Sequence, residues 1–181
     1  MDKYIEKLKE IIDITTTVPN KDNKRDVKKF FKKNKFDDAV FSAYKYFLLN
    51  YGNCYIKDDY YFETSDSSFN IKQEKFEIDT FFNLENIKKY ALDYSDIIQN
   101  GFLPIAEIVG GDLVCIEKNT GEIWFWFHDV SKDNFLKVSN SFGEFICGFQ
   151  FSKQMNNGSV KMNLSPELDA FLKEASKNQN E

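Results

Sequence analysis

The single histidine of the chain, His128, is the residue best suited to catalysis, because imidazole acts near neutral pH as a general base, a metal ligand or the partner of a nucleophile. It ends an aromatic run, two positions after Trp126, and precedes Asp129. Any Ser–His–Asp or Cys–His scheme would depend on this one side chain, and the sequence pairs it with no nucleophile. We therefore expect a hydrogen-bonded sheet histidine with a structural role, and no catalytic residues.

Metal and phosphate binding also lack a supporting pattern. Cys54, Cys115 and Cys147 have no CxxC spacing, and together with one histidine they supply no zinc-ligand set. The carboxylates show no EF-hand spacing. Gly110-Gly111 joins one predicted strand to the next, whereas a phosphate-binding loop needs a helix N-terminus after its glycines. The sequence predicts no metal, no cofactor and no enzyme activity, and the thiols are typical of a reduced, cytoplasmic protein.

Charge is divided unevenly along the 181 residues. The net charge is −5, yet residues 21–35 hold eight basic residues against Asp22 and Asp26, a local excess of +6 that leaves −11 on the rest of the chain. Phe30 and Phe31 interrupt the basic run as the core face of a helix would, and the acidic remainder would repel a phosphate backbone. We expect no nucleic-acid binding.

The densest acidic run is residues 58–85, where eight acidic residues stand against Lys72 and Lys75, and we predict that it lies in turns between short strands. One interpretation is a solvated rim. The other is a protein interface in which tyrosines supply burial and carboxylates steer a basic partner. The candidate partner-binding residues are Asp58, Asp59, Tyr60, Tyr61, Glu63 and Asp66.

Residues 101–129 predict a β-meander. Three apolar, β-branched or aromatic runs at 102–109, 113–116 and 123–128 are separated by Gly110-Gly111 and by a turn ending at Gly121. The glycine pair suits a two-residue hairpin turn that requires positive φ, and Pro104 is expected near a strand start, where a missing N–H does little harm. Both faces of the last strand are bulky, which predicts a sheet covered by helices on at least one face.

The remaining pattern supplies those helices. Apolar residues recur at helical spacing over 4–12, from about 26 to 35, over 38–51 and over 85–98, in a short helix that starts from a Ser141–Glu144 capping box, and over 160–176. Further short strands are predicted at 55–56, 60–62, 69–71, 76–84 and 135–138. The expected fold is α+β: a twisted, mostly antiparallel sheet of about six strands, packed by N-terminal and C-terminal helices.

The length favours a single domain over residues 1–181, with N-terminal helices in 1–53, a sheet core with an inserted helix in 54–150, and a C-terminal helix in 160–176. Charges interrupt the apolar residues of the first turns, so no signal-peptide core is expected, and no run of 18 apolar residues occurs. We expect a cytoplasmic protein that does not bind membranes.

A family resemblance rests on the meander. Phe-Leu-Pro-Ile-Ala at 102–106, Gly-Gly-Asp at 110–112 and Gly-Glu-Ile-Trp-Phe-Trp-Phe-His-Asp at 121–129 resemble the core motif of the SUKH superfamily. The matching motif positions are Pro104, Gly110, Gly111, Gly121, Trp126 and His128. The Ser-Phe-Gly-Glu-Phe run at 141–145 resembles the last shared helix. In the first half, residues 35–38 lack the Leu-Pro of the family pattern, and residues 50–53 replace its Asn-Gly-Gly with Asn-Tyr-Gly-Asn.

The resemblance implies a function. The superfamily includes bacterial immunity proteins that neutralise polymorphic toxins and fungal regulators of cell-wall synthesis. It implies that this chain binds a cognate toxin, with nucleases among the toxins such proteins face. We expect a monomer or weak homodimer. Two alternatives are a regulatory protein-interaction module and a small-ligand site over the sheet near Trp126 and His128.

Overall fold

The computed structural model describes residues 2–13, 24–66, 71–131 and 133–152, so the helix expected over 160–176 lies outside the described residues. The elements are α1 (Asp2–Ile11), α2 (Lys24–Asn34), α3 (Ser42–Asn50), β1 (Cys54–Tyr55), β2 (Tyr60–Asp66), β3 (Ile71–Phe76), β4 (Ile78–Phe81), α4 (Leu84–Asp93), α5 (Ser95–Gln99), β5 (Phe102–Ile108), β6 (Leu113–Glu117), β7 (Ile123–Trp126), β8 (Phe135–Ser139), α6 (Phe142–Cys147) and β9 (Gln150–Phe151).

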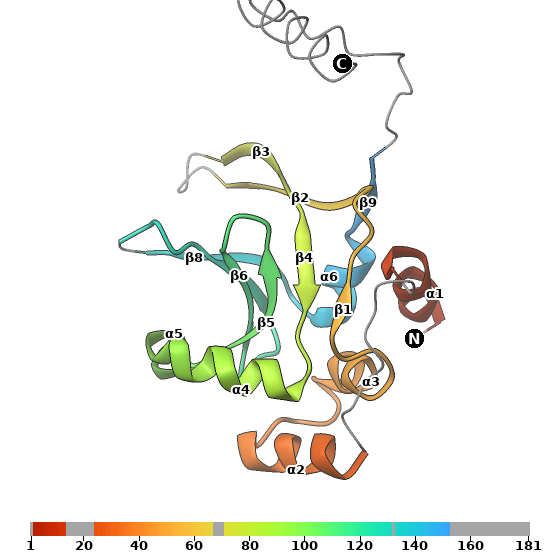
Figure 1. The fold of residues 1–181 in the computed structure, drawn as a ribbon, viewed down its shortest axis with the longest axis vertical. Helices are drawn as coiled ribbons and strands as arrows, with labels where there is room; N and C mark the ends of the chain where they lie inside the picture. Colours follow the sequence, from red (N-terminus) through yellow and green to blue (C-terminus); the bar gives the residue numbers. More distant parts are fainter. Residues whose placement is uncertain (1, 14–23, 67–70, 132, 153–181) are drawn as a thin grey trace, which may run out of the picture.

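Two antiparallel sheets organise these elements (Figure 1). The larger has six strands in the order β1-β4-β5-β6-β7-β8, and its β5-β6-β7 centre is the predicted meander. The smaller, in the order β3-β2-β9, was not foreseen. The predicted strand over 76–84 is wrong because it is split at Glu77 between β3 and β4, which belong to different sheets, and because α4 begins at Leu84. The α+β class is confirmed.

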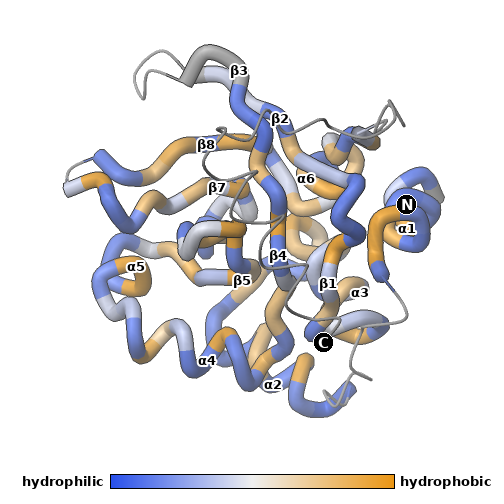
Figure 2. The backbone as a smooth tube through the Cα atoms, turned by 45° about the horizontal axis from the view of Figure 1, so that its top comes forward, coloured by the Kyte–Doolittle hydropathy of each residue, from blue (hydrophilic) through white to orange (hydrophobic). Residues whose placement is uncertain are grey.

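Helices cover both faces of the larger sheet. Consecutive strand residues point to opposite faces, and in β7 the ring of Phe125 lies 6.2 Å from that of Phe145 in α6, whereas the ring of Trp126 lies 5.2 Å from that of Tyr94 beside α5. One face therefore packs against α6 and α3, and the other against α4 and α5. Figure 2 shows blue and orange alternating along α4, as in an amphipathic helix with one buried side.

The glycine turns of the meander have the predicted left-handed backbone. Gly110 and Gly111 have φ values of +106° and +98°. The two-residue turn is wrong in its length, because Ile108 N donates to Asp112 O at 2.8 Å, which leaves Val109, Gly110 and Gly111 in the loop. The turn is therefore a three-residue hairpin loop between β5 and β6.

Pro104 lies near the start of its strand, as expected. It is the third residue of β5, which is an interior strand, and it pairs with Cys115. The register of the β5–β6 pair shifts between Pro104 and Ala106, so the missing N–H falls at an irregularity where a ladder bond is already interrupted.

Helix boundaries also differ from the sequence pattern. The predicted helix over 38–51 begins only at Ser42, because the Asp37 carboxylate accepts from the N–H groups of Ala39 and Val40 and holds a separate turn. The predicted helix over 85–98 is divided at Tyr94 into α4 and α5. Only half of the capping box forms, since Ser141 Oγ accepts from Glu144 N at 3.2 Å while the Glu144 carboxylate accepts from Asn140 Nδ2.

Candidate functional site

His128 lies beyond the end of β7, and its side chain is 39% exposed. Asp112 Oδ1 is 2.7 Å from His128 Nδ1 and accepts from His128 N at 3.0 Å, and Asp129 Oδ1 lies 3.1 Å from Nε2. The hydrogen bond to Asp112 is the main cause that raises the pKa of His128. The prediction that His128 lies within the covered sheet is wrong, because β7 ends at Trp126. The imidazole of His128 instead connects the end of β7 to the β5–β6 loop through Asp112.

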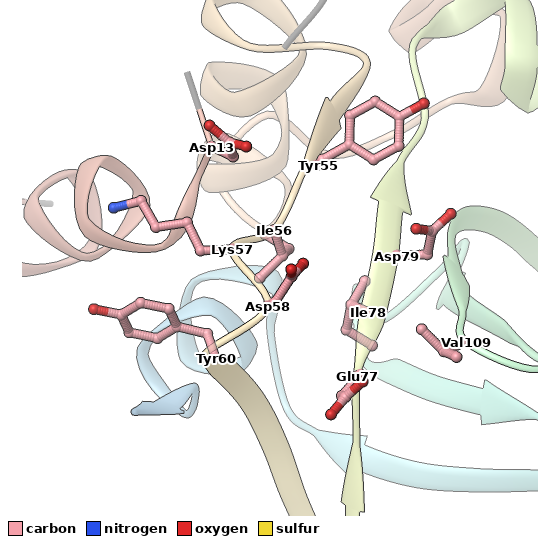
Figure 3. Close-up of a pocket in the computed structure, with 10 residues that line it drawn as sticks. All are labelled: Asp13, Tyr55, Ile56, Lys57, Asp58, Tyr60, Glu77, Ile78, Asp79 and Val109. Atoms are coloured by element: carbon pink, nitrogen blue, oxygen red, sulfur yellow. The ribbon is translucent and has the colours of Figure 1, made fainter. Parts of the chain in front are cut away.

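The cavity nearest to the predicted acidic interface is a groove of about 480 Å³ where four segments of the chain meet. Figure 3 shows its lining, which comes from the end of α1, the segment from β1 to β2, the start of β4 and the β5–β6 loop. We call it the acidic groove, and its residues are Asp13, Tyr55, Ile56, Lys57, Asp58, Tyr60, Glu77, Ile78, Asp79 and Val109.

Backbone pairing fixes this groove. Lys57 N donates to Ile11 O at 3.0 Å and Asp13 N donates to Tyr55 O at 3.0 Å, which joins the end of α1 to the β1–β2 segment. Val109 N donates to Glu77 O at 2.9 Å, which joins the β5–β6 loop to the start of β4. Because four segments distant in the sequence are hydrogen-bonded in these two pairs, the groove has a preformed floor and walls.

Strand alternation exposes two of the carboxylates. Ile78 is 3% exposed, and its neighbours Glu77 and Asp79 are both exposed, as expected when alternate residues of a strand point to opposite sides. Asp58 lies in the turn closed by Tyr60 N donating to Lys57 O at 2.9 Å. In Figure 3 the three carboxylates surround Ile78 and the adjoining segment of β4.

The groove is strongly negative. Among the described residues, Asp58, Glu77 and Asp79 have no side-chain hydrogen bond and no ion pair. Lys57 is the one cation in the lining, and its ammonium donates to the backbone oxygen of Glu10, pointing away from the carboxylates toward α1. Hydrated carboxylates without a protein partner are available to a cationic ligand, at little cost in broken internal contacts.

Apolar surface adjoins these charges. Tyr55 is 37% exposed and Val109 is 60% exposed, and both line the acidic groove. Protein interfaces combine aromatic and aliphatic anchors with a polar rim. The groove therefore has the composition of a protein-binding surface that would suit a partner with a basic side chain beside an apolar one.

The structure separates the six candidate partner-binding residues. Asp58 and Tyr60 line the acidic groove, whereas Asp59, Tyr61 and Glu63 do not, and the side chain of Asp66 lies outside the part that the structure describes. The prediction that the acidic run lies in turns is wrong for Glu63 and Asp66, which belong to β2, since β2 is longer than the apolar pattern indicated. It is also wrong for Glu74, which belongs to β3.

Tyr60 is a wall residue rather than an exposed anchor. It is 8% exposed, its ring lies 5.3 Å from that of Phe151, and its hydroxyl donates to Glu10 Oε1 at 3.0 Å. Burial, with the hydrogen bond to Glu10, raises the pKa of Tyr60 to about 12, so the hydroxyl stays a donor. Tyr61 is half-buried and donates to Gln150 Oε1 at 3.3 Å.

Sequence reasoning did not select Asp13, Tyr55, Glu77, Asp79 or Val109 as site residues. The one local signal was the Glu-Ile-Asp pattern at 77–79, which is typical of a strand with an exposed polar side. The rest of the groove follows from pairings between distant segments.

The surface near Trp126, where a small-ligand site was the alternative, is already covered by protein. This side chain is 6% exposed, and Tyr94 packs against its ring at 5.2 Å. Within the ranges that the structure describes, no group of three or more His, Cys, Asp or Glu side chains could hold a metal ion. In the same ranges, no helix has the length and hydropathy needed to cross a membrane.

The two sheets with their helices define an α+β protein. Residues 41–148 match the SMI1 / KNR4 family (SUKH-1), and the chain belongs to this family. The match includes the meander and extends from the turn before α3 to the end of α6.

A curated relative, the SPbeta prophage-derived uncharacterized protein YokK of Bacillus subtilis (strain 168), is 32% identical over 125 residues. The match covers 58% of this chain and 64% of the relative, so it spans less than two thirds of the relative's length.

Proposed function

We propose that this protein is a bacterial immunity protein that binds a cognate toxin in the cytoplasm and blocks it stoichiometrically, without catalysis of its own. The observation that carries the proposal is the set of carboxylates of Asp58, Glu77 and Asp79, which have no side-chain partner among the described residues and adjoin the exposed Tyr55 and Val109. Membership in SUKH-1 and the similarity to a prophage-derived protein support this class of function.

The charges favour a partner with a basic surface. Opposite charges accelerate association, from about 10⁵–10⁶ M⁻¹s⁻¹ without steering to as much as about 10⁸–10⁹ M⁻¹s⁻¹ at low salt. A nuclease must present basic residues to its nucleic-acid substrate. An inhibitor that places carboxylates against that surface would exclude the substrate, and the preformed groove would lower the entropy cost of binding.

The test replaces the three carboxylates with neutral isosteres, Asp58→Asn, Glu77→Gln and Asp79→Asn. Association with the toxin encoded beside the gene is then measured across a salt series. We expect the on-rate at low salt to fall at least tenfold, because electrostatic steering is lost. The on-rate should also depend less on salt, because a weaker charge attraction between the two proteins is left for salt to screen. A growth assay with co-expressed toxin should show weaker protection.

The matched control removes three acidic residues elsewhere, through Asp59→Asn, Glu63→Gln and Glu74→Gln. It changes the net charge equally but leaves the groove lining intact. If the control and the groove variant slow association equally, net charge rather than this groove governs binding. If neither has an effect, the groove is not the interface.

A regulatory interaction module is the second candidate, and the family's SMI1 / KNR4 description favours including it. Such a module would bind a protein of its own cell and would give no protection against the toxin encoded beside the gene.

The variant His128→Gln separates binding from enzyme action. Full protection by the folded variant is expected, and lost protection with intact binding would support a catalytic role.

A further inference from the structure

A second groove, of about 520 Å³, lies between α2 and α4, and residues of α5 and of the start of β5 complete its lining. Figures 1 and 2 both show α2 and α4 next to each other, on the side of the molecule away from β2 and β3. We call this groove the lysine-rimmed slot. It shares no lining residue with the acidic groove.

The interior of the slot is apolar. Leu84, Ile87 and Leu103 form buried parts of its wall, with exposed fractions of 2%, 1% and 4%. Ala91 and Ile98 are partly exposed within it. An apolar cavity between helices, in the range of about 300–1,000 Å³, is typical of small-molecule sites.

The rim is cationic. Lys29 and Lys33 come from α2, Lys88 from α4 and Lys118 from the turn after β6, and Asp26 is the single acidic lining residue. Within the part of the chain that the structure describes, none of these four ammonium groups has an ion-pair partner. Uncompensated cations around an apolar cavity favour a ligand that carries negative charge at the end of an apolar body.

Lys118 places one of these charges at the slot wall. It is half-buried, its ammonium donates to Ile98 O at 3.2 Å, and burial lowers its pKa. An ammonium has three donors, so two remain for other acceptors. A ligand carboxylate here could accept from these remaining donors.

We propose that the lysine-rimmed slot binds a small amphiphilic carboxylate, with its apolar body between α2 and α4 and its carboxylate at Lys88 and Lys118. The size of the slot favours such a molecule over a free phosphate or acetate, which has no apolar body to cover the partly exposed Ala91 and Ile98. The site is independent of toxin binding, because it uses other residues and the opposite charge.

The test measures binding of a series of straight-chain carboxylates by isothermal titration calorimetry, at concentrations below micelle formation. We expect saturable 1:1 binding that tightens from octanoate to decanoate by about fourfold for each methylene that becomes fully buried. Acetate and inorganic phosphate should bind far more weakly, because they lack an apolar body. Decanol, which has no charge, should bind at least tenfold more weakly than decanoate.

Two variants locate the site. Lys88→Gln with Lys118→Gln should weaken decanoate binding at least tenfold, and Ala91→Phe should abolish it by filling the slot. The control, Lys28→Gln with Lys32→Gln, removes two exposed lysines of α2 that do not line the slot and should bind as the wild type does. Thermal melts confirm folding of each variant. Unsaturable binding, equal binding of decanol, or wild-type affinity in Ala91→Phe would overturn the proposal.

Discussion

Gly121 offers a sharp test of how the meander is attached to the N-terminal helices. Its φ is +74°, and its N–H donates to Glu117 O at 3.0 Å to close the β6–β7 turn. A Cβ at this position would lie 2.7 Å from Val40 Cγ1 and 3.7 Å from Phe41 Cζ. Gly121→Ala therefore combines a backbone cost with a steric cost. Gly110→Ala supplies the matched control, because φ there is +106° and no heavy atom lies within 4 Å of the added Cβ.

The magnitudes follow from these two terms. A left-handed backbone costs a residue with a Cβ about 1–2 kcal/mol. Replacing a glycine with alanine also lowers the conformational entropy of the unfolded chain, which stabilises the folded state by about 0.4–1 kcal/mol. The net effect of Gly110→Ala should be a destabilisation of about 1 kcal/mol. In Gly121→Ala, Val40 must also leave its position, and an off-rotamer side chain costs about 0.5–1.5 kcal/mol. We expect a loss of about 2 kcal/mol for Gly121→Ala.

Equilibrium unfolding in urea measures both losses, and thermal melts should show a shift of roughly 2–4 °C per kcal/mol for a domain of this size. Val40 is 46% exposed, so Val40→Ala should cost little by itself. In the double variant it should remove the steric part of the Gly121→Ala loss. The reasoning fails if Gly121→Ala costs no more than Gly110→Ala, or if Val40→Ala gives no recovery.

Three further outcomes test the rest of the structure. The pKa of His128 is raised in the folded state, so the protonated side chain stabilises the fold below the usual histidine pKa of about 6.5, and this stabilisation is lost as pH rises through the raised value. In urea unfolding, the free energies of the wild type and His128→Gln should therefore differ more at pH 5.5 than at pH 8.5. Burial raises the pKa values of the Cys54 and Cys115 thiols, so both should react with a thiol reagent at pH 8 only as fast as the protein unfolds. Cys147 is partly exposed, so labelling is assigned to each cysteine by peptide mass spectrometry, and fast labelling of Cys54 or Cys115 in the native protein would contradict their burial. Phe125→Ala should cost about 3–5 kcal/mol in urea unfolding, because the fully buried ring lies 4.9 Å from that of Phe76, and a loss below 1 kcal/mol would refute its central place in the core.

The sequence by itself determined the local chemistry of the chain. Glycines that must adopt positive φ, alternating apolar residues and the helical spacing of Val27, Phe30 and Phe31 each specify a short segment through its own backbone and solvent preferences. For that reason the meander, the edge strand β8 and the amphipathic helices were predictable, and the motif in residues 101–129 indicated the family.

Tertiary pairing decided where those segments end and which sheet they join. Residues 71–84 contain β3, β4 and the start of α4, and no local signal at Glu77 marks the transfer from one sheet to the other. Tyr94 divides a helix that its periodicity would continue, and its ring packs edge-on against Trp126. Contacts between distant residues outweigh a weak local preference at such places.

The two grooves depended most on the tertiary structure. Glu77 and Asp58 were visible as acidic residues, but only the pairing of β1 with β4 and the bond from Val109 N to Glu77 O bring them beside Val109. The lysines of α2 read as a solvated face until α4 is placed opposite them. A sequence specifies the charge and polarity of each side chain, whereas a concave surface exists only after segments far apart in the chain have packed together.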